Sequence, residues 1–285
     1  MSPLRQKMIN QMTLRGFSPR THQSYIDAVA GLAKFFNKSP DRLDKEEVQS
    51  YLLHLMGERK LSWSSCNVAI SAFRFLYGET LGNDSMRLAI PTRKKITQLP
   101  EILSAVELER LFAGVENPKH RVMLMTTYAG GLRVSEVVRL KVTDIHSERM
   151  MIRVDQGKGN KDRYTILSER LLKELRIYWS MYRPPLWLFL SKNPNKPMSI
   201  GTAQKIYYKA KAKANIKRGK GIHTLRHCFA THMLEDGVDV RTIQMLMGHK
   251  SIMTTMIYLQ VTRKKLDSTK SPLDLLEIPD SKKFE

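Results

Sequence analysis

The N-terminal third of the chain repeats its apolar residues at the three- and four-residue spacing of amphipathic helices. The apolar positions of residues 4–12 would share one face of a first helix. Ser18 followed by Pro19 is a typical helix start, because serine caps free backbone N–H groups and proline fits the first turn. The apolar stripe behind this start predicts a second helix with a core-facing side, formed by Tyr25, Ala28, Val29, Leu32, Phe35 and Phe36.

Two further helices are predicted before the chain changes character. Asp44 and Glu47 have the spacing of a capping box, in which each side chain bonds the other residue's backbone N–H, and an apolar stripe follows them. Another stripe, over residues 64–77, is expected to end near Gly78. Four helices of this length predict a small N-terminal helical domain over residues 1–88.

A segment poor in apolar residues separates this domain from the rest of the chain. It contains a proline and the basic run at residues 93–95, which is the composition of an exposed connection. We therefore expect a basic linker over residues 89–101. A second domain, over residues 102–285, would begin with the capping-box spacing of Ser104 and Glu107.

The hydrophobic period changes once within the second domain. Residues 150–154 and 163–167 are rich in strand-forming side chains, and the glycine-containing stretch 156–161 has the composition of a turn, so a β-hairpin is predicted. Helical spacing returns over Leu171–Tyr182, after Ser199, over Thr224–Asp236 and over Asp239–Met247. The expected fold class is mainly α with a small antiparallel β-sheet, that is, α+β.

Composition and charge narrow the class of protein. Hydrophobic residues make up 42% of the 285 residues and charged residues 26%, which is typical of a globular chain rather than a disordered one. Lysines and arginines number 48 against 27 aspartates and glutamates, which gives a formal net charge of +21. Both predicted domains are net positive, so we expect a polyanionic partner, and two basic domains clamping double-stranded DNA fit best.

Cysteine content and hydropathy indicate an intracellular protein. Cys66 and Cys228 are too few for a disulfide framework or a four-cysteine zinc site. No apolar run reaches the ~20 residues that a membrane helix needs, and residues 1–16 lack the apolar core of a signal peptide. We expect a reduced, cytoplasmic protein that is associated with the bacterial nucleoid when it is bound to DNA.

Several polar residues stand in apolar or glycine-rich surroundings. His223 and Arg226 are three residues apart at the predicted start of a helix, where the helix dipole favours a bound anion. Arg133 follows two glycines, Lys158 lies in the predicted turn, and Tyr258 belongs to an apolar segment. Taken singly, such residues are more often a helix-end arginine, a solvated lysine and a core tyrosine.

The order and spacing of these residues change that judgement, because the set resembles the tyrosine recombinase, or phage integrase, family. Residues 99–258 are similar to the catalytic domain of that family and carry in succession A-G-G-L-R-V-S-E, G-K-G-N-K-D-R, H-T-L-R-H-C-F-A-T-H, M-G-H and T-T-M-I-Y. The preceding helices resemble its SAM-like core-binding domain. Met247 and Gln260 stand where leucine and histidine are common in the family, and neither departure removes a catalytic group.

The resemblance implies a catalytic set and a reaction. It places the catalytic residues of the family on Arg133, Lys158, His223, Arg226, His249 and Tyr258. The tyrosine would attack a DNA phosphodiester and form a covalent 3′-phosphotyrosyl intermediate, which a 5′-hydroxyl reverses without metal, nucleotide or other cofactor. Paired guanidinium groups match the nonbridging phosphate oxygens, and a phenol with a pKa near ~10 needs help in losing its proton.

The remaining roles follow from the same chemistry. We expect His223 to be the base, Lys158 to protonate the leaving 5′ oxygen, and His249 to hydrogen-bond a phosphate oxygen. Glu136 lies one helical turn beyond Arg133, where it would either orient that guanidinium group or be an ordinary surface acid. The sequence leaves both alternatives open.

Neighbouring charged residues are assigned lesser roles. Lys161 and Arg163 are expected to contact phosphates or to be solvated, and His227 and His232 to serve in packing or in support of the site. A metal is not expected, because the metalloprotease pattern needs a glutamate where Thr224 stands. A phosphate-binding loop of the G-x-x-x-x-G-K type is also missing from the sequence.

The resemblance also implies an assembly. A homo-tetramer would pair two DNA sites and exchange their strands in sequence. An apolar segment near residues 271–278 would form a docking helix, either on a neighbouring subunit or on its own domain. Two alternatives stay open: a type IB topoisomerase, which rejoins the same strand by the same chemistry, and a noncatalytic DNA-binding regulator, which needs the charge but no nucleophile.

Overall fold

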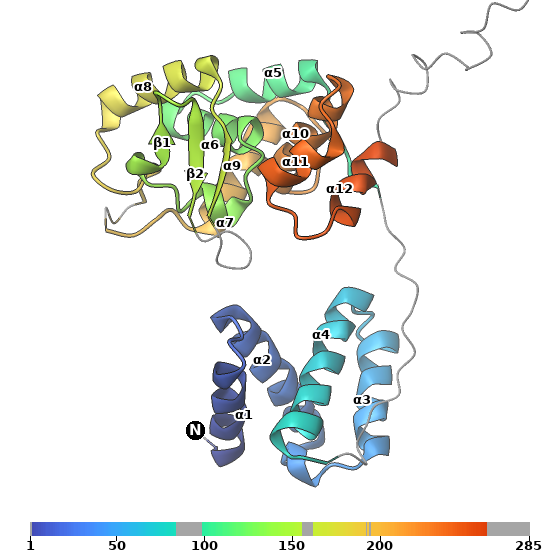
Figure 1. The fold of residues 1–285 in the computed structure, drawn as a ribbon. Coiled ribbons are helices and arrows are strands. Elements are labelled where there is room, and N and C mark those ends of the chain that lie inside the picture. The colour runs from blue at the N-terminus through green and yellow to red at the C-terminus, as the bar shows by residue number, and fades with distance from the viewer. Residues whose placement is uncertain (1, 84–98, 156–161, 192, 194, 261–285) are drawn as a thin grey trace, which may run out of the picture. The chain divides into compact units, whose positions relative to one another are not determined.

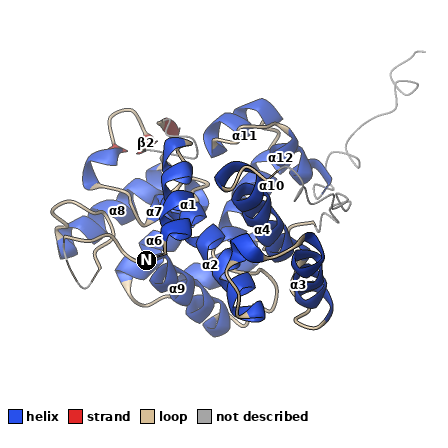
Figure 2. Cartoon of the chain, turned by 90° about the horizontal axis from the view of Figure 1, so that it is seen from below, coloured by secondary structure: helices blue, strands red, loops and turns tan. Residues whose placement is uncertain are grey.

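The chain divides into two compact units, Met1–Lys95 and Ile96–Glu285. The computed structural model describes residues 2–83, 99–155, 162–191, 193 and 195–260, and its ribbon is drawn in Figure 1. Among these residues helices dominate both units, and β-strands occur in the second unit only (Figure 2). The predicted class, mainly α with a small antiparallel sheet, is confirmed.

Four α-helices are found among residues 2–83, the described part of the first unit, as the apolar pattern predicts. They are α1 (Pro3–Leu14), α2 (Pro19–Phe36), α3 (Lys45–Gly57) and α4 (Trp63–Arg74), with a 3₁₀ turn at Pro40–Arg42. The predicted caps are present, since the Ser18 hydroxyl accepts a bond from the Thr21 N–H and Asp44 and Glu47 close a reciprocal capping box. The core between the helices includes Leu32, Val48, Ile70 and Phe73.

The end of α4 differs from the prediction. The helical conformation does not end near Gly78, because a π-helical turn follows α4 over Phe75–Thr80. Phe75, Leu76 and Tyr77 are all buried, and the Tyr77 hydroxyl donates to the carbonyl of Pro40 at 2.8 Å. Burial of three successive large side chains therefore continues the helical turn past the glycine.

The second unit surrounds a three-stranded sheet with helices. The helices are α5 (Ala105–Ala113), α6 (Pro118–Ala129), α7 (Val134–Val137), α8 (Glu169–Tyr182), α9 (Ile200–Lys213), α10 (His223–Glu235), α11 (Val240–Met247) and α12 (Met253–Met256). Short 3₁₀ turns lie at Val142–Asp144 and Ile257–Gln260. Within this unit the sheet lies on one side and α10, α11 and α12 on the other (Figure 1).

The sheet contains the predicted hairpin and one strand more. The strands β1 (Ile145–His146), β2 (Met151–Val154) and β3 (Arg163–Ile166) pair antiparallel in that order. Ile152 faces Thr165 across the hairpin, and both are buried against the core. The strand β1 is not predicted from the sequence, because a strand of two residues is too short to show an alternation of apolar and polar positions.

Three predicted features lie wholly or mostly outside the described residues. They are the linker at residues 89–101, the hairpin turn that carries Lys158, and the docking segment near residues 271–278.

Candidate active site

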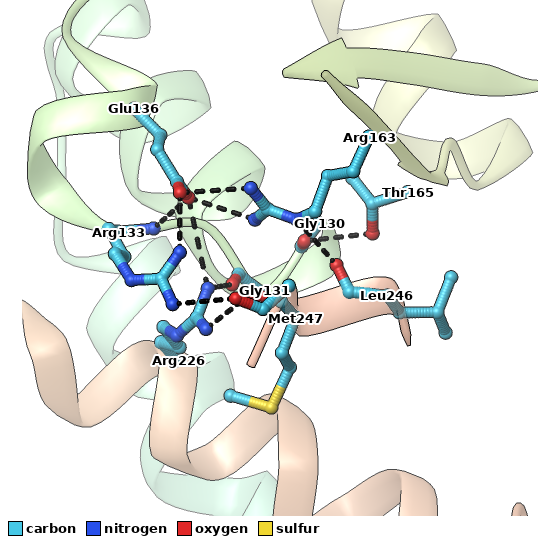
Figure 3. A network of polar contacts seen from close by, with 10 residues as sticks. Gly130, Gly131, Arg133, Glu136, Arg163, Thr165, Arg226, Leu246 and Met247 are labelled. Atoms are coloured by element: carbon cyan, nitrogen blue, oxygen red, sulfur yellow. Dashed lines mark hydrogen bonds and ion pairs between the residues drawn. The ribbon is translucent and has the colours of Figure 1, made fainter. Parts of the chain in front are cut away.

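A single buried carboxylate gathers three arginines in the second unit. Glu136 Oε1 accepts a bond from Arg133 Nη1 at 2.7 Å and from Arg163 Nη1 at 2.9 Å, and its Oε2 accepts from Arg163 Nη2 at 2.9 Å. Arg226 Nη1 lies 3.8 Å from the same Oε2. Figure 3 shows how these side chains converge from α7, β3 and α10.

The charge balance of this network leaves it positive. Burial acts to raise the pKa of Glu136, but the bonds and charges of Arg163 and Arg133 outweigh it and hold that pKa at about 2. The carboxylate is therefore ionised at neutral pH. It compensates one of the three guanidinium charges around it, so the group is suited to bind an anion.

Arg226 is fully enclosed, with 1% of its surface exposed. Its Nη1 donates to the carbonyl of Gly131 at 2.5 Å and its Nη2 to the carbonyl of Met247 at 2.6 Å. Burial, with the charge of Arg133 added, lowers the pKa of Arg226 to about 9, so the side chain still carries its proton at pH 7. The bonds fix the guanidinium between the end of α6 and the end of α11.

Two glycines supply backbone carbonyls that bind the guanidinium groups of Arg226 and Arg133. Gly131 has φ +58°, and a Cβ atom there would collide with the ring of Phe229. Gly248 has φ +62°, and its carbonyl accepts a bond from Arg133 Nη2 at 3.1 Å. Residues other than glycine rarely adopt this left-handed backbone conformation. Glycine is therefore needed at both positions if the two carbonyls are to bind Arg226 and Arg133.

Of the two alternatives for Arg163, a solvated side chain is wrong. The side chain is only 11% exposed, and besides its two bonds to Glu136 it donates from Nε to the carbonyl of Leu246 at 2.9 Å. It is therefore a largely buried group with partners inside the protein. It ties β3 to α11 and fixes the carboxylate beside Arg133. Lys161, with which it was grouped, is outside the described residues.

Tyr258 is buried beside this network, in the 3₁₀ turn Ile257–Gln260 that follows α12. It is 2% exposed and packs in a small apolar cluster with Phe229, Ala230, Leu234, Ile243 and Met247. Burial raises the pKa of Tyr258 to about 12, although the positive charges of Arg226 and Arg133 act in the opposite direction. At pH 7 the side chain is thus a neutral phenol, and the charges of both guanidinium groups act on it.

Two histidines of α10 connect this tyrosine to the start of the helix. His227 Nδ1 lies 3.0 Å from the Tyr258 hydroxyl, and the rings of His227 and His223 meet edge-on at 4.7 Å. Burial, followed by the charge of Arg226, lowers the pKa of His227 to about 4. His223 is an exposed residue, yet the protein around its ring and then the charges of His227 and Arg226 lower its pKa to about 4 as well. Both rings are neutral at pH 7.

His249 binds the segment that leads to the tyrosine. Its Nδ1 lies 2.8 Å from the hydroxyl of Thr255, a fully buried residue of α12, and its carbonyl accepts a bond from Gln244 Nε2 at 3.0 Å. Burial and then the charges of Arg226 and Arg133 lower the pKa of His249 to about 3. This imidazole is therefore a neutral hydrogen-bonding group.

The structure gathers most of the residues that the sequence singled out. Arg133, Arg226, His223, His249 and Tyr258 form one cluster through their bonds and through their mutual effects on pKa. Lys158 lies outside the described residues.

Two further results concern residues whose role the sequence left open or missed. Glu136 is 9% exposed and bonds Arg133, so it is not an ordinary surface acid. The contact of His227 with Tyr258 was not foreseen, although its position four residues after His223 places both on one face of α10. His232 fits the expected packing role, since its Nδ1 lies 2.9 Å from the Tyr128 hydroxyl.

Neither a group of possible metal ligands nor a membrane-spanning helix is found in the part of the chain that the structure describes. Within it, His, Cys, Asp and Glu side chains nowhere form a group of three or more that could hold a metal ion. Nor does any helix among the described residues have the length and apolar character needed to cross a membrane. What the cluster can do chemically is bind an oxyanion between guanidinium groups and present a phenol oxygen to it.

Comparison with known proteins extends over both units. The model of the phage integrase family matches residues 98–265, and that of the phage integrase N-terminal SAM-like domain matches residues 4–86. The protein y4qK of Sinorhizobium fredii, which its name proposes to be an integrase/recombinase, is 44% identical over 98% of this chain and 91% of its own length. Tyrosine recombinase XerA of Pyrococcus horikoshii is 33% identical over 97% of this chain and 95% of its own.

Solved structures give the same fold. A crystal structure of XerA recombinase is 28% identical, with a TM-score of 0.55, and the match covers 93% of this chain and 95% of that one. A lambda integrase dimer bound to a core site has a TM-score of 0.71 over 88% of this chain and 95% of that one. At 17% identity the second likeness concerns the fold alone.

Proposed function

This chain belongs to the phage integrase family and is a tyrosine recombinase, an enzyme that breaks and rejoins DNA strands in site-specific recombination, and we propose that Tyr258 is its nucleophile. One observation carries the assignment. The Tyr258 hydroxyl bonds a histidine of α10, the same helix that holds Arg226, and the charges of Arg226 and Arg133 act on the phenol. The two guanidinium groups near the hydroxyl would stabilise a phenolate, which is required of a nucleophile and has no purpose for a tyrosine that only fills the core.

The chemistry follows from the groups around the tyrosine. Arg133 and Arg226 would hold the nonbridging oxygens of one phosphate and stabilise the charge that builds on them during attack. The Tyr258 oxygen forms a bond to phosphorus while the bond from phosphorus to the 5′ oxygen breaks. His223 accepts the phenol proton and Lys158 gives one to the departing oxygen.

The products are a 3′-phosphotyrosyl protein and a free 5′-hydroxyl. When the 5′-hydroxyl of a partner duplex attacks the phosphotyrosyl bond, the tyrosine leaves with its proton restored and the phosphodiester is rebuilt. One phosphate ester replaces another at each step, so the cycle needs no nucleotide. His249, held neutral by its buried surroundings, would hydrogen-bond a phosphate oxygen and keep α12 in place.

The partner in this proposal is double-stranded DNA. The net charge of +21, shared by both units, suits a duplex that lies against each of them. Strand exchange between two sites would further need a homo-tetramer of this chain. On this view the protein is associated with the nucleoid when it is at work.

The variant Tyr258→Phe tests the nucleophile. It removes one oxygen and leaves the ring that packs in the core, so we expect folding and DNA binding to persist while covalent protein–DNA adducts vanish. Adducts are measured by denaturing the protein after incubation with fragmented genomic DNA and recovering the DNA that stays attached. Adducts that persist in this variant would refute the assignment.

A second assay separates recombination from the topoisomerase alternative. Two differently labelled duplexes that carry the recovered sequence should yield joined products with both labels. Relaxation of supercoils without any doubly labelled product would favour a type IB topoisomerase.

A further inference from the structure

His227 touches the reacting atom although it stands outside the proposed catalytic set. Its Nδ1 lies 3.0 Å from the Tyr258 hydroxyl, and the two ring centres are 5.7 Å apart at 51°. The separation of 3.0 Å between Nδ1 and the hydroxyl oxygen is normal for a hydrogen bond. The contact joins the middle of α10 to the turn Ile257–Gln260, which carries the Tyr258 hydroxyl.

The part of α10 that carries the imidazole is fixed in the fold. The preceding residue, Arg226, donates to the carbonyls of Gly131 and Met247, and the sulfur of the following residue, Cys228, accepts a bond from the Leu103 N–H at 3.2 Å. The His227 ring itself packs edge-on against the ring of His223, with 4.7 Å between the ring centres. A ring carried by a fixed helix and packed against a neighbour is well placed to fix the direction of a second group.

We propose that His227 is a positioning residue for Tyr258: its Nδ1 accepts the hydrogen bond of the phenol and aims the oxygen at the phosphate held by Arg133 and Arg226. The inference rests on the proposed role of Tyr258 as nucleophile. It adds a residue that orients the attacking atom and takes no part in the movement of protons.

The acid–base properties of the pair describe a hydrogen bond between two neutral groups. The pKa of Tyr258 is raised to about 12, and that of His227 is lowered to about 4. His223 has a similarly lowered pKa, so the positioning role of His227 rests on its contact with the hydroxyl group, and the pH profile of the variants separates positioning from proton transfer. A neutral imidazole in this place can hold the hydroxyl group without deprotonating it.

The same helix supplies a matched control. His232 Nδ1 lies 2.9 Å from the hydroxyl of Tyr128, so it forms a second histidine–tyrosine pair of α10. This pair involves neither the arginine network nor Tyr258. The variant His232→Phe therefore removes the same kind of bond from the same helix outside the site.

The test compares three variants in a single round of cleavage. His227→Phe keeps an aromatic ring and removes the acceptor, whereas His227→Asn places an amide oxygen near the position of Nδ1. His232→Phe is the control. The measured quantities are the rate of covalent adduct formation on a nicked duplex across pH 6 to 9, and the affinity for the same duplex without cleavage.

We expect His227→Phe to form adducts about tenfold more slowly, because an oriented hydrogen bond of this kind corresponds to about one order of magnitude in rate. His227→Asn should recover most of that loss, the shape of the pH profile should stay unchanged, and DNA affinity should stay close to that of the parent protein. His232→Phe should cleave at the parent rate.

Several outcomes would overturn the proposal. Loss of more than about a hundredfold in both His227 variants, with one limb of the pH profile gone, would make this histidine a proton-transfer group. Equal rates in all variants would show that the bond does not matter for attack. Failure of the nucleophile assignment would look different, because Tyr258→Phe would then still form adducts.

Discussion

Glu136 determines how many positive charges the site can hold. Its two oxygens accept bonds from Arg133 and Arg163 and lie close to Arg226. Without the carboxylate, three guanidinium groups would share a space from which water is largely excluded. Such a group loses stability strongly when one partner is removed, since the remaining charges are left buried and uncompensated.

We therefore predict that Glu136→Gln lowers the stability of the protein at pH 7 by roughly 3 to 5 kcal/mol. The folded-state pKa, about 2, lies below the ordinary 4.5 of a glutamate. The stabilisation by the carboxylate is thus fully present above pH ~4.5 and fades as the pH falls through ~2. The variant should approach the parent protein in stability at low pH.

Urea unfolding at pH 7 and at pH 3, followed on the full chain, measures this difference. Glu109→Gln, which changes an exposed acid of α5, is the control and should alter stability little at either pH. A gap between Glu136→Gln and the parent protein that is the same at both pH values would show that the carboxylate is not held ionised by the arginines.

The turn between α6 and α7 is the element on which both proposed phosphate-binding arginines depend. Gly131 begins this turn in the left-handed region and bonds Arg226 through its carbonyl, and Arg133 follows two residues later at the start of α7. The turn is closed by the Thr165 hydroxyl of β3, which donates to the carbonyl of Gly130 at 2.9 Å. Helix, turn and sheet are thus tied together at one point.

We predict that Gly131→Ala destabilises the protein by roughly 2 to 4 kcal/mol. The left-handed backbone is unfavourable for alanine, and the added Cβ would collide with the Phe229 ring. Adduct formation should fall further than DNA binding, since Arg226 loses its anchor. Thermal unfolding and the adduct assay measure the two effects.

Gly57→Ala is the matched control for this prediction. It lies at the end of α3, where a Cβ would meet nothing within 4 Å, and it should be neutral or slightly stabilising. A Gly131→Ala variant as stable and as active as the Gly57→Ala variant would contradict the role given to the turn.

Local signals in the sequence were enough to predict most of the elements. The caps at Ser18, Asp44 and Ser104 work through bonds within four residues, so they can be found without the fold, and all three are present. The turn Phe75–Thr80 and the strand β1 depend instead on burial and pairing with distant segments. A local pattern holds no information on such contacts.

The same distinction applies to the site. The order and spacing of the motifs were enough to select Arg133, Arg226 and Tyr258, because the whole set resembles the catalytic residues of the family. The bond of Arg163 to Glu136 and that of His227 to Tyr258 join residues 27 and 31 positions apart. Both depend on how β3 and the turn after α12 pack, which becomes visible in the folded chain.

The molecule as a whole combines a basic surface with a reactive centre in its second unit. Both units are net positive, which gives affinity for DNA of any sequence, while the arginine network and the tyrosine belong to the second unit. Within that unit the tyrosine packs in an apolar cluster and is acted on by the charges of Arg226 and Arg133, so on the proposed function one chain would supply both the phosphate-binding arginines and the attacking group.

The most direct test identifies the atom that becomes joined to DNA. The adduct is trapped on a duplex with a nick just beyond the cleavage site, so that the short 5′-hydroxyl fragment diffuses away, and the digested protein is sequenced by mass spectrometry. We predict a single modified peptide with the 3′-phosphate on Tyr258. A nucleotide on any other residue, Tyr128 included, or linkage through a 5′-phosphate, would contradict the account.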